Sequence, residues 1–293
     1  MTASLVFLHA YTPLHSGTGQ GVESIDLPIA RERATGLPVV PGSSIKGCLR
    51  DTIPLTDEEK AAVFGPETRN ADAHAGALRV ADARLTLLPV RSLTATFVWA
   101  ACPFVLKRLK RDADACGIET PEVKPVAKLN ARITAGTGTV KFLEEKHEVQ
   151  KLVLEELDLK VEESGGNAKE WADWFCTHLF RDEWKLEVEK RFAIVDDDTF
   201  TFLAEFGTEV NAHIRIDDKT GTVEDGALWY QEALPAETVL TSIMHADASK
   251  SALKLSSAKV MDKATFDGVM QIGGKSNTGM GVVRLVVVKG DVR

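Results

Sequence analysis

The segment from Gly273 to Gly281 has the composition that phosphate binding requires, since it reads Gly-Gly-Lys-Ser-Asn-Thr-Gly-Met-Gly. Glycines let a backbone approach a phosphate or a ribose closely, and amide N–H groups that point outward from such a loop can bind an anion. Lys275 adds a positive charge to the four glycines, which are Gly273, Gly274, Gly279 and Gly281. The segment is not a Walker loop, because Val269 stands where that motif has its first glycine. A tight connection before an edge strand would look the same, so the loop alone leaves both interpretations open.

A second segment that could bind phosphate is the start of a short helix, which we predict over Ile45–Asp51. Ser43 and Ser44 stand at this start, where serine side chains commonly cap a helix and unpaired N–H groups favour an anion. Lys46 and Arg50 are four residues apart and therefore lie on one helix face. A serine cap, a helix start and two cations together predict a phosphate site. The alternative is an ordinary capped helix with two solvated cations.

Asp26 and His15 are the residues that could act on a bound ribose. Asp26 is an acid among apolar neighbours, and an acid near a ribose could orient or deprotonate a 2′-hydroxyl or hold a hydrated Mg²⁺ ion. On spacing alone, Asp26 would be a turn carboxylate before Leu27 and Pro28. His15 begins a second glycine loop, which ends at Gly19, and a lone histidine in such a place more often has a structural role.

The composition and charge of the chain favour some classes of protein and argue against others. A net charge of -8 counts against nucleic-acid binding, but the acids gather in residues 144–189, whereas basic residues gather in 31–50 and 107–111. A chain can carry a basic groove on an acidic body. Aromatic residues make up only 6%, which argues against broad stacking platforms. The four cysteines lack Cys-x-x-Cys spacing, which fits a reducing cytoplasm, and no apolar run reaches the length of a membrane span.

The elements predicted around these residues mix helices with strands. Strands are predicted over Leu5–Leu14, Leu78–Leu88, Ala95–Ala101, Val210–Ile216, Ala227–Ala233, Thr238–His245 and Val282–Val288. Further helices are predicted over Thr56–Phe64, Ala168–Phe180, Thr199–Phe206 and Asp262–Gln271. This order predicts an α+β fold in one domain over residues 1–293, with a ferredoxin-like (RRM-like) β-α-β-β-α-β core and large insertions. One insertion, acid-rich and mainly helical, would span about 107–208, and a protruding hairpin would span about 209–233.

These segments, in this order, resemble the RAMP superfamily of CRISPR proteins. The resemblance rests on five stretches, which are His15–Gly19, Ile25–Glu32, Thr35–Gly47, Arg79–Ala83 and Ile272–Arg284. Within the superfamily, the Asp-Leu-Pro-Ile step that begins at Asp26 and the segment His213–Ala227 are most similar to the repeated backbone subunit of the type III-B Cmr complex. The matches run from the first predicted strand to the last, so the resemblance covers the whole chain.

The resemblance implies a subunit of an antiviral, cytoplasmic ribonucleoprotein. Its copies would stack head to tail along a CRISPR guide RNA, together with other Cmr subunits. The implied guide contacts are His15, Ser43, Ser44, Lys46, Arg50, Gly273, Gly274, Lys275, Gly279 and Gly281. The protruding hairpin would be a thumb that carries His213 and Arg215, enters the guide–target duplex and displaces one base pair at a regular interval. Base pairing would then read the sequence while the protein reads backbone and shape.

The resemblance also implies RNA cleavage at Asp26, beside the displaced target nucleotide. The implied activity is that of an endoribonuclease that works only in the guide-loaded complex. A divalent cation, Mg²⁺ or Mn²⁺, would assist at Asp26 without binding tightly to the isolated protein. Asp217 and Asp218, near the thumb, could contribute to cutting or merely repel RNA. Two further hypotheses stay open, a guide-binding scaffold beside a separate cutting subunit and a small-molecule nucleotide enzyme that uses the glycine loop.

Overall fold

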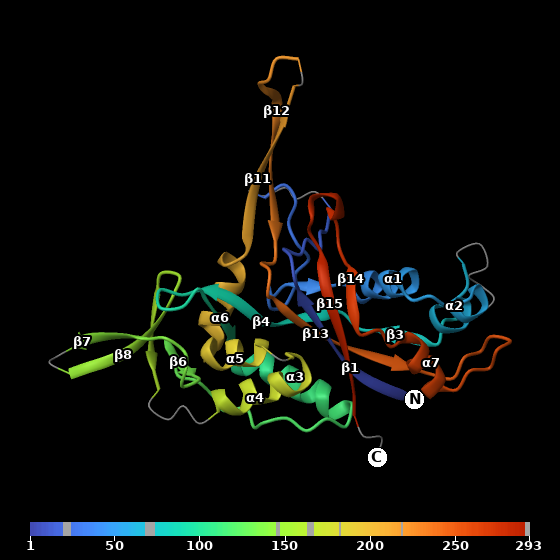
Figure 1. The fold of residues 1–293 in the computed structure, drawn as a ribbon, viewed down its shortest axis with the longest axis horizontal. Coiled ribbons are helices and arrows are strands. Elements are labelled where there is room, and N and C mark those ends of the chain that lie inside the picture. The colour runs from blue at the N-terminus through green and yellow to red at the C-terminus, as the bar shows by residue number, and fades with distance from the viewer. Residues whose placement is uncertain are drawn as a thin grey trace.

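A large, mostly antiparallel sheet forms the body of the protein in this computed structural model (Figure 1). The structure describes residues 1–19, 25–67, 74–144, 147–162, 167–181, 183–217 and 219–290. The strands follow one another across the sheet as β14 (Gly268–Gln271), β15 (Val282–Lys289), β1 (Thr2–Ala10), β13 (Val239–Ala246), β4 (Ala83–Arg91), β5 (Phe97–Ala101), β10 (Phe192–Val195), β6 (Asn130–Ile133), β9 (Leu157–Val161), β8 (His147–Leu154) and β7 (Val140–Glu144). Beside this path, β2 (Val39–Val40) pairs with β4 and β3 (Leu78–Val80) pairs with β13. The protein is therefore an α+β protein, as the sequence predicts.

Strand β1 lies inside the sheet and is buried on both faces. Successive side chains of a strand point to opposite faces, so Leu5 and Phe7 enter one hydrophobic core while Val6 and Leu8 enter the other. The core at Val6 is completed by α1 (Gly42–Thr52), α2 (Asp57–Phe64) and α7 (Ser257–Ala264). The core at Phe7 is completed by α3 (Pro103–Ala115), α4 (Ala168–His178), α5 (Glu183–Lys190) and α6 (Asp197–Phe206). None of the helices in the described ranges is long and apolar enough to cross a membrane.

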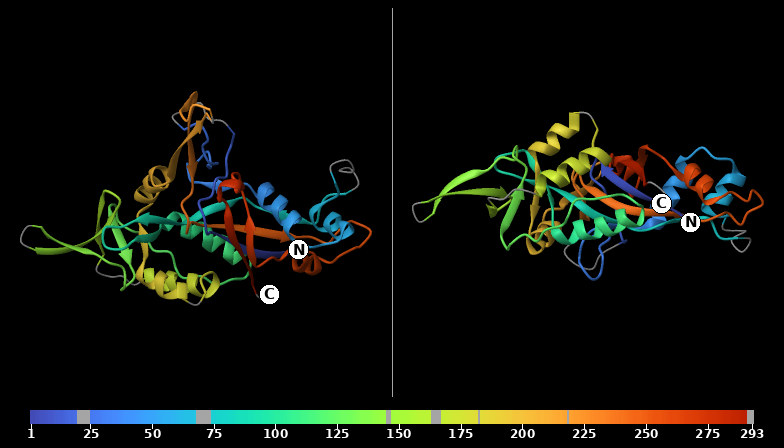
Figure 2. Two further views of the ribbon diagram at one scale, coloured as in Figure 1. Left: turned by 45° about the horizontal axis from the view of Figure 1, so that its top comes forward. Right: turned by 90° about the horizontal axis from the view of Figure 1, so that it is seen from below.

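A two-stranded hairpin stands apart from the large sheet and projects from the body (Figures 1 and 2). We call it the thumb hairpin, and it consists of β11 (Glu209–Ile216) and β12 (Val223–Ala233). Strict alternation in the sequence predicts this hairpin, and its register pairs Ala212 with Tyr230 and His213 with Trp229. An isolated two-stranded hairpin has no core of its own, so its position depends on the contacts at its base.

Three predicted elements have different limits in the structure. The predicted strand Leu5–Leu14 ends at Ala10, and the predicted strand Leu78–Leu88 is divided into β3 and β4. The predicted helix Asp262–Gln271 is wrong, because Ser256 caps a helix that has already ended at Ala264. Gly268–Gln271 is a strand that pairs with β15.

The region 107–208 contains more strand than the sequence predicts. Its helices are accompanied by β6, β7, β8, β9 and β10, and the hairpin of β7 and β8 reaches outward at one end of the sheet (Figures 1 and 2). In β8, the residues from His147 to Lys151 are exposed or half-buried, so they carry little of the apolar alternation by which a strand is recognised. The helical interpretation of this region therefore holds only for α3, α4, α5 and α6.

Candidate functional site

Three segments that are far apart in the sequence meet around one open hollow of about 510 Å³. We call it the Asp26 hollow, and it is lined by Asp26, Leu27, Arg215, Gly226, Leu228, Trp229 and Lys275. Asp26 comes from the segment before β2, Arg215 from the thumb hairpin and Lys275 from the glycine loop. One carboxylate and two cations are thus brought together on an open surface, where they could hold a phosphate beside an acid.

Asp26 is held in place by the backbone of β12. Its Oδ2 accepts a hydrogen bond of 2.8 Å from the N–H of Tyr230. The N–H of Leu27 donates to the Tyr230 carbonyl at 3.0 Å, and the N–H of Glu232 donates to the Leu27 carbonyl at 3.0 Å. The segment therefore adds a short ladder to β12 at the base of the thumb hairpin. Asp26 itself is exposed, and its Oδ1 has no partner among the described residues, so this oxygen is available to a ligand.

Glu232 links this segment to the base of the thumb hairpin. Glu232 is only 3% exposed, and its Oε2 accepts from the N–H of Ile29 at 3.0 Å. Its Oε1 accepts from Arg31 at 2.5 Å and from the Thr208 hydroxyl at 2.9 Å. Its backbone carbonyl accepts from Nδ1 of His15 at 2.7 Å. One buried carboxylate thus connects the Asp26 segment, the connection between α6 and β11, and β12. No local motif in the sequence predicts this role for Glu232.

The glycine loop, Gly273 to Gly281, packs closely against the chain around His15. A Cβ on Gly273 would lie 2.5 Å from the His15 carbonyl oxygen, and the residue has φ of +83°, so glycine is required there. Two backbone hydrogen bonds hold the loop. The N–H of Gly274 donates to the His15 carbonyl at 3.0 Å, and the N–H of Gly281 donates to the Pro13 carbonyl at 2.9 Å. Most amide groups of the loop are used within the protein, by Gly274, Thr278, Gly279, Met280 and Gly281. Few amide N–H groups of the loop therefore remain for a phosphate. What the loop presents to a ligand is glycine backbone without side chains and the exposed Lys275.

The side chain of His15 lies beneath the loops and not on their surface. It is 6% exposed, and a Cβ on Gly17 would lie 2.5 Å from its Nε2. Because Nδ1 donates to the Glu232 carbonyl, the ring fixes the distance between the His15–Gly19 loop and β12. This geometry gives His15 a supporting role and offers no support to the predicted direct contact with RNA.

The start of α1 differs from the predicted serine-capped anion site. The helix begins at Gly42, its N-cap is Pro41, and no side chain caps it from that position, so the predicted serine cap is wrong. A Cβ on Gly42 would lie 2.2 Å from the Val80 carbonyl oxygen. This close approach brings Asp82 to the helix start, where its Oδ1 accepts from Gly42 N–H at 2.8 Å. One helix-start donor therefore already has an anionic partner, although Ser43 and Ser44 are exposed in the first turn.

Lys46 and Arg50 share a helix face as predicted, but they have different environments. Burial, and secondarily the charge of Arg50, lower the pKa of Lys46. Arg50 donates to the carbonyl of Gly65, which ends α2, so part of its guanidinium is engaged within the protein. Neither side chain lines the Asp26 hollow. Their helix does contact β14, the strand that leads into the glycine loop (Figure 1).

The thumb hairpin places an aromatic side chain at the Asp26 hollow that the sequence did not single out. Trp229 lines the hollow and stacks on His213, with ring centroids 5.6 Å apart and planes at 14°. The Nε2 of His213 is buried and has no hydrogen-bond partner among the described residues. The signal that could have found Trp229 is its place in the predicted strand Ala227–Ala233, because the structure pairs it with His213.

Asp217, near the tip of the thumb hairpin, has a local structural role. Its Oδ1 accepts from the N–H groups of Lys219 and Thr220 at 2.7 and 3.1 Å, and these bonds lower the pKa of the carboxyl. Asp218 lies outside the described residues. In the described ranges, no three His, Cys, Asp or Glu side chains come together to hold a metal ion. Asp26 could therefore give a cation a single carboxylate ligand but not a protein-built cage.

The class of this protein follows from its fold and its site together. The fold is a sheet with helices over both faces and a projecting hairpin, and the site is a glycine loop beside a single exposed acid. The sequence profile of the RAMP superfamily matches residues 7–284, and the chain belongs to that superfamily. It is 35% identical to the CRISPR system Cmr endoribonuclease Cmr4 of Pyrococcus furiosus, over 98% of this chain and 96% of that protein.

Solved structures agree with this relationship. The crystal structure of oligomeric Cmr4 from Pyrococcus furiosus is similar with a TM-score of 0.71 and 27% identity, over 100% of both chains. A chain of the type III-B Cmr-beta complex bound to cognate target RNA is similar with a TM-score of 0.72 and 20% identity, over 98% of this chain and 97% of that chain. At that identity the second similarity concerns the fold alone.

Proposed function

We propose that this chain is the repeated backbone subunit of a type III-B CRISPR Cmr complex. In this role it holds the guide RNA along a filament of its own copies and cleaves complementary target RNA at regular intervals. The observation that carries the proposal is the Asp26 hollow, where Asp26 meets Arg215 and Lys275. It occurs in a chain that is similar over its whole length to a Cmr endoribonuclease.

The finer assignment of the fold, a ferredoxin-like core, belongs to the same proposal. Strands β15, β1, β13 and β4 are neighbours in that order and pair antiparallel. Along the chain, α1 lies between β1 and β4, and α7 lies between β13 and β15. Both helices contribute to the core at Val6. This order and these connections support a β-α-β-β-α-β core.

Cleavage would follow from the placement of these groups around a displaced nucleotide. Lys275 and Arg215 bind phosphates as cations, and the Oδ1 of Asp26 accepts the proton of a 2′-hydroxyl. The 2′-oxygen then forms a bond to the adjacent phosphorus while the bond from phosphorus to the 5′-oxygen of the next nucleotide breaks. The products are a 2′,3′-cyclic phosphate and a 5′-hydroxyl, whose oxygen takes its proton from water. Stacked A-form RNA disfavours this in-line geometry, so the thumb hairpin is needed to splay the nucleotide out.

A divalent cation, Mg²⁺ or Mn²⁺, is part of the proposal as an aid to cleavage. Asp26 would give it one carboxylate oxygen, and RNA phosphates and water would complete its ligands, as is common for Mg²⁺. Bound there, the cation would neutralise charge at the phosphate that is cut. With one protein ligand, the isolated chain would bind it only weakly.

Purification of the complex from its host tests the proposed function. We expect a bound small RNA with a uniform 5′ sequence, several copies of this chain per complex, and cleavage of a complementary RNA at even spacing. A monomeric chain that binds a mononucleotide tightly and carries no RNA would instead support the small-molecule enzyme.

The substitution Lys46→Ala tests the backbone contact at α1. We expect the affinity for every RNA sequence to fall by a similar factor. The negative slope of log affinity against log salt should become shallower by about 0.7 for single-stranded RNA, because one phosphate contact is lost. The control is Lys141→Ala, which removes an exposed lysine of the β7–β8 hairpin that pairs with Glu148. Filter binding at several salt concentrations gives both quantities. A loss that depended on RNA sequence would contradict a backbone contact.

A further inference from the structure

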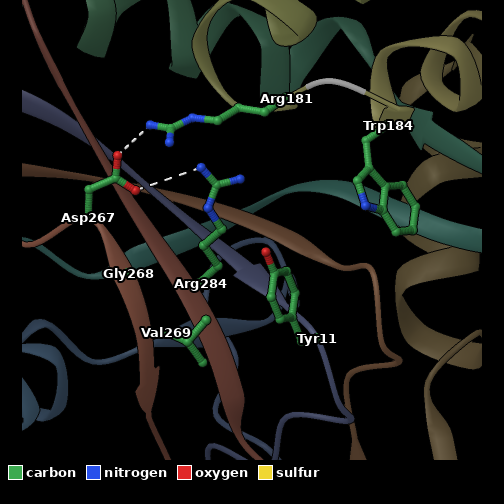
Figure 3. Close-up of a pocket in the computed structure, with 7 residues that line it drawn as sticks. All are labelled: Tyr11, Arg181, Trp184, Asp267, Gly268, Val269 and Arg284. Atoms are coloured by element: carbon green, nitrogen blue, oxygen red, sulfur yellow. Dashed lines mark hydrogen bonds and ion pairs between the residues drawn. The ribbon is translucent and has the colours of Figure 1, made fainter.

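A second hollow, of about 570 Å³, lies on the surface beside β14 and β15 and shares no residue with the Asp26 hollow (Figure 3). We call it the arginine–aromatic hollow. Its walls are Tyr11 and Trp184, and its charged residues are Arg181, Arg284 and Asp267. A hollow of this volume is in the range of small-ligand sites, which is roughly 300–1,000 Å³.

The two aromatic walls are held rigidly yet remain 41% exposed each. Both rings contact His9 edge to face, with centroid distances of 5.2 Å for Tyr11 and 6.2 Å for Trp184. His9 is itself fixed by Glu237, which lies 2.6 Å from its Nε2. Trp184 also packs against Trp99. Fixed, partly exposed aromatic rings are the surfaces on which proteins stack the bases of single-stranded RNA.

The arginines face the same hollow and are oriented by one acid. Asp267 lies 2.5 Å from Arg181 and 3.7 Å from Arg284, and Figure 3 shows both guanidinium groups turned toward it. Arg284 also donates to the Leu179 carbonyl and is 14% exposed, whereas Arg181 is 62% exposed. Each guanidinium has five N–H donors, so donors remain for a ligand. These three side chains together carry one net positive charge, which favours an anion.

The position of the hollow connects it to the glycine loop. The N–H of Tyr11 donates to the carbonyl of Val282, which directly follows the loop, at 2.8 Å. Val269 lies on the rim of the hollow, four residues before Gly273, a distance of about 13 Å along a strand. A strand of RNA that leaves the glycine loop on this side would reach the hollow within a few nucleotides.

We infer that the arginine–aromatic hollow binds one nucleotide of the RNA strand that passes over the glycine loop. The base stacks on Tyr11 or Trp184, and the phosphate takes donors from Arg181 and Arg284. This inference rests on the proposed RNA-binding function and adds a further RNA contact to it.

The substitution Arg181→Ala tests the hollow, with Arg79→Ala as a matched control. Both arginines are similarly exposed, 62% and 59%, and each pairs with one aspartate. Binding of an eight-nucleotide uridine RNA to the full chain is measured by fluorescence anisotropy across salt concentrations. We expect Arg181→Ala to weaken binding about fivefold and to reduce the salt slope by about 0.7. Arg79→Ala should stay within about twofold, because its arginine lies outside the hollow.

The stacking contact is tested separately by Trp184→Ala and Trp184→Phe. Loss of a stacked base weakens binding about tenfold, so we expect this for alanine and recovery of most of the affinity for phenylalanine. Thermal unfolding of both variants shows whether the packing on Trp99 survives.

Three outcomes would overturn the inference. Unchanged RNA affinity in Arg181→Ala and Trp184→Ala, beside a loss in Lys46→Ala, would remove the nucleotide site and leave the proposed function standing. Reduced self-association in sedimentation, with unchanged binding of the short RNA, would make the hollow a seat for a second copy of the chain. No RNA binding by the unsubstituted chain would overturn the proposed function as well.

Discussion

Asp26→Asn should abolish target cleavage, lowering its rate by about a hundredfold or more, while guide binding stays unchanged. Asparagine has nearly the same shape, and its amide oxygen can still accept the hydrogen bond that Asp26 takes from the N–H of Tyr230. The ladder between the Asp26 segment and β12 is therefore kept, and the substitution removes only the negative charge and the proton acceptor. The measurement is single-turnover cleavage of a complementary RNA by the assembled complex.

Asp217→Asn is the matched control for this experiment. Asp217 is also an aspartate of this region, but it is half-buried and its carboxylate accepts hydrogen bonds within the turn at the tip of the thumb hairpin. We expect the rate of cleavage to remain within about threefold, since surface substitutions away from a site have small effects. Cleavage that survived in Asp26→Asn would favour the scaffold hypothesis, and a comparable loss in both variants would show that the hairpin tip takes part in cutting.

The elements that the sequence predicted well are those whose signals are local. The thumb hairpin follows from strict alternation, and α2 follows from the capping box of Thr56 with Glu59. The helix α7 was misplaced because a run of charged and apolar residues suits either position, and the cap at Ser256 decides between them. The strand β14 could not be predicted alone, because its four residues become a strand only by pairing with β15.

The candidate site shows the same division between local and long-range signals. Asp26 and Lys275 carry recognisable motifs, and the structure brings both to one hollow. Trp229 and Glu232 have no local motif, because their roles arise when the Asp26 segment pairs with β12, about two hundred residues further along the chain. Arg50 lies on the same helix face as Lys46, as predicted, but its guanidinium donates a hydrogen bond to the Gly65 carbonyl. Helix periodicity cannot reveal this partner, because it lies outside the helix.

Glu232→Ala should have the largest effect on stability of any single substitution at this site. It leaves the buried N–H of Ile29, the guanidinium of Arg31 and the hydroxyl of Thr208 without their common acceptor. Breaking a buried ion pair by removing one partner costs about 3 kcal/mol in the free energy of unfolding. Because the same carboxylate holds the Asp26 segment against β12, cleavage should fall as well. The measurement is urea unfolding of the isolated chain, followed by cleavage at a temperature where the variant stays folded.

Glu224→Ala is the control, since Glu224 lies on the same strand and also pairs with an arginine, Arg215, at 3.5 Å. That pair is exposed, so its loss should change the free energy of unfolding by less than about 1 kcal/mol. Glu232→Gln keeps an acceptor oxygen but loses the charge, and it should fall between the two. If Glu232→Ala and Glu224→Ala lost equal stability, the buried carboxylate would not be what joins the thumb hairpin to the Asp26 segment. The position of Asp26 beside the ribose would then depend on its backbone ladder with β12 and not on the Glu232 carboxylate.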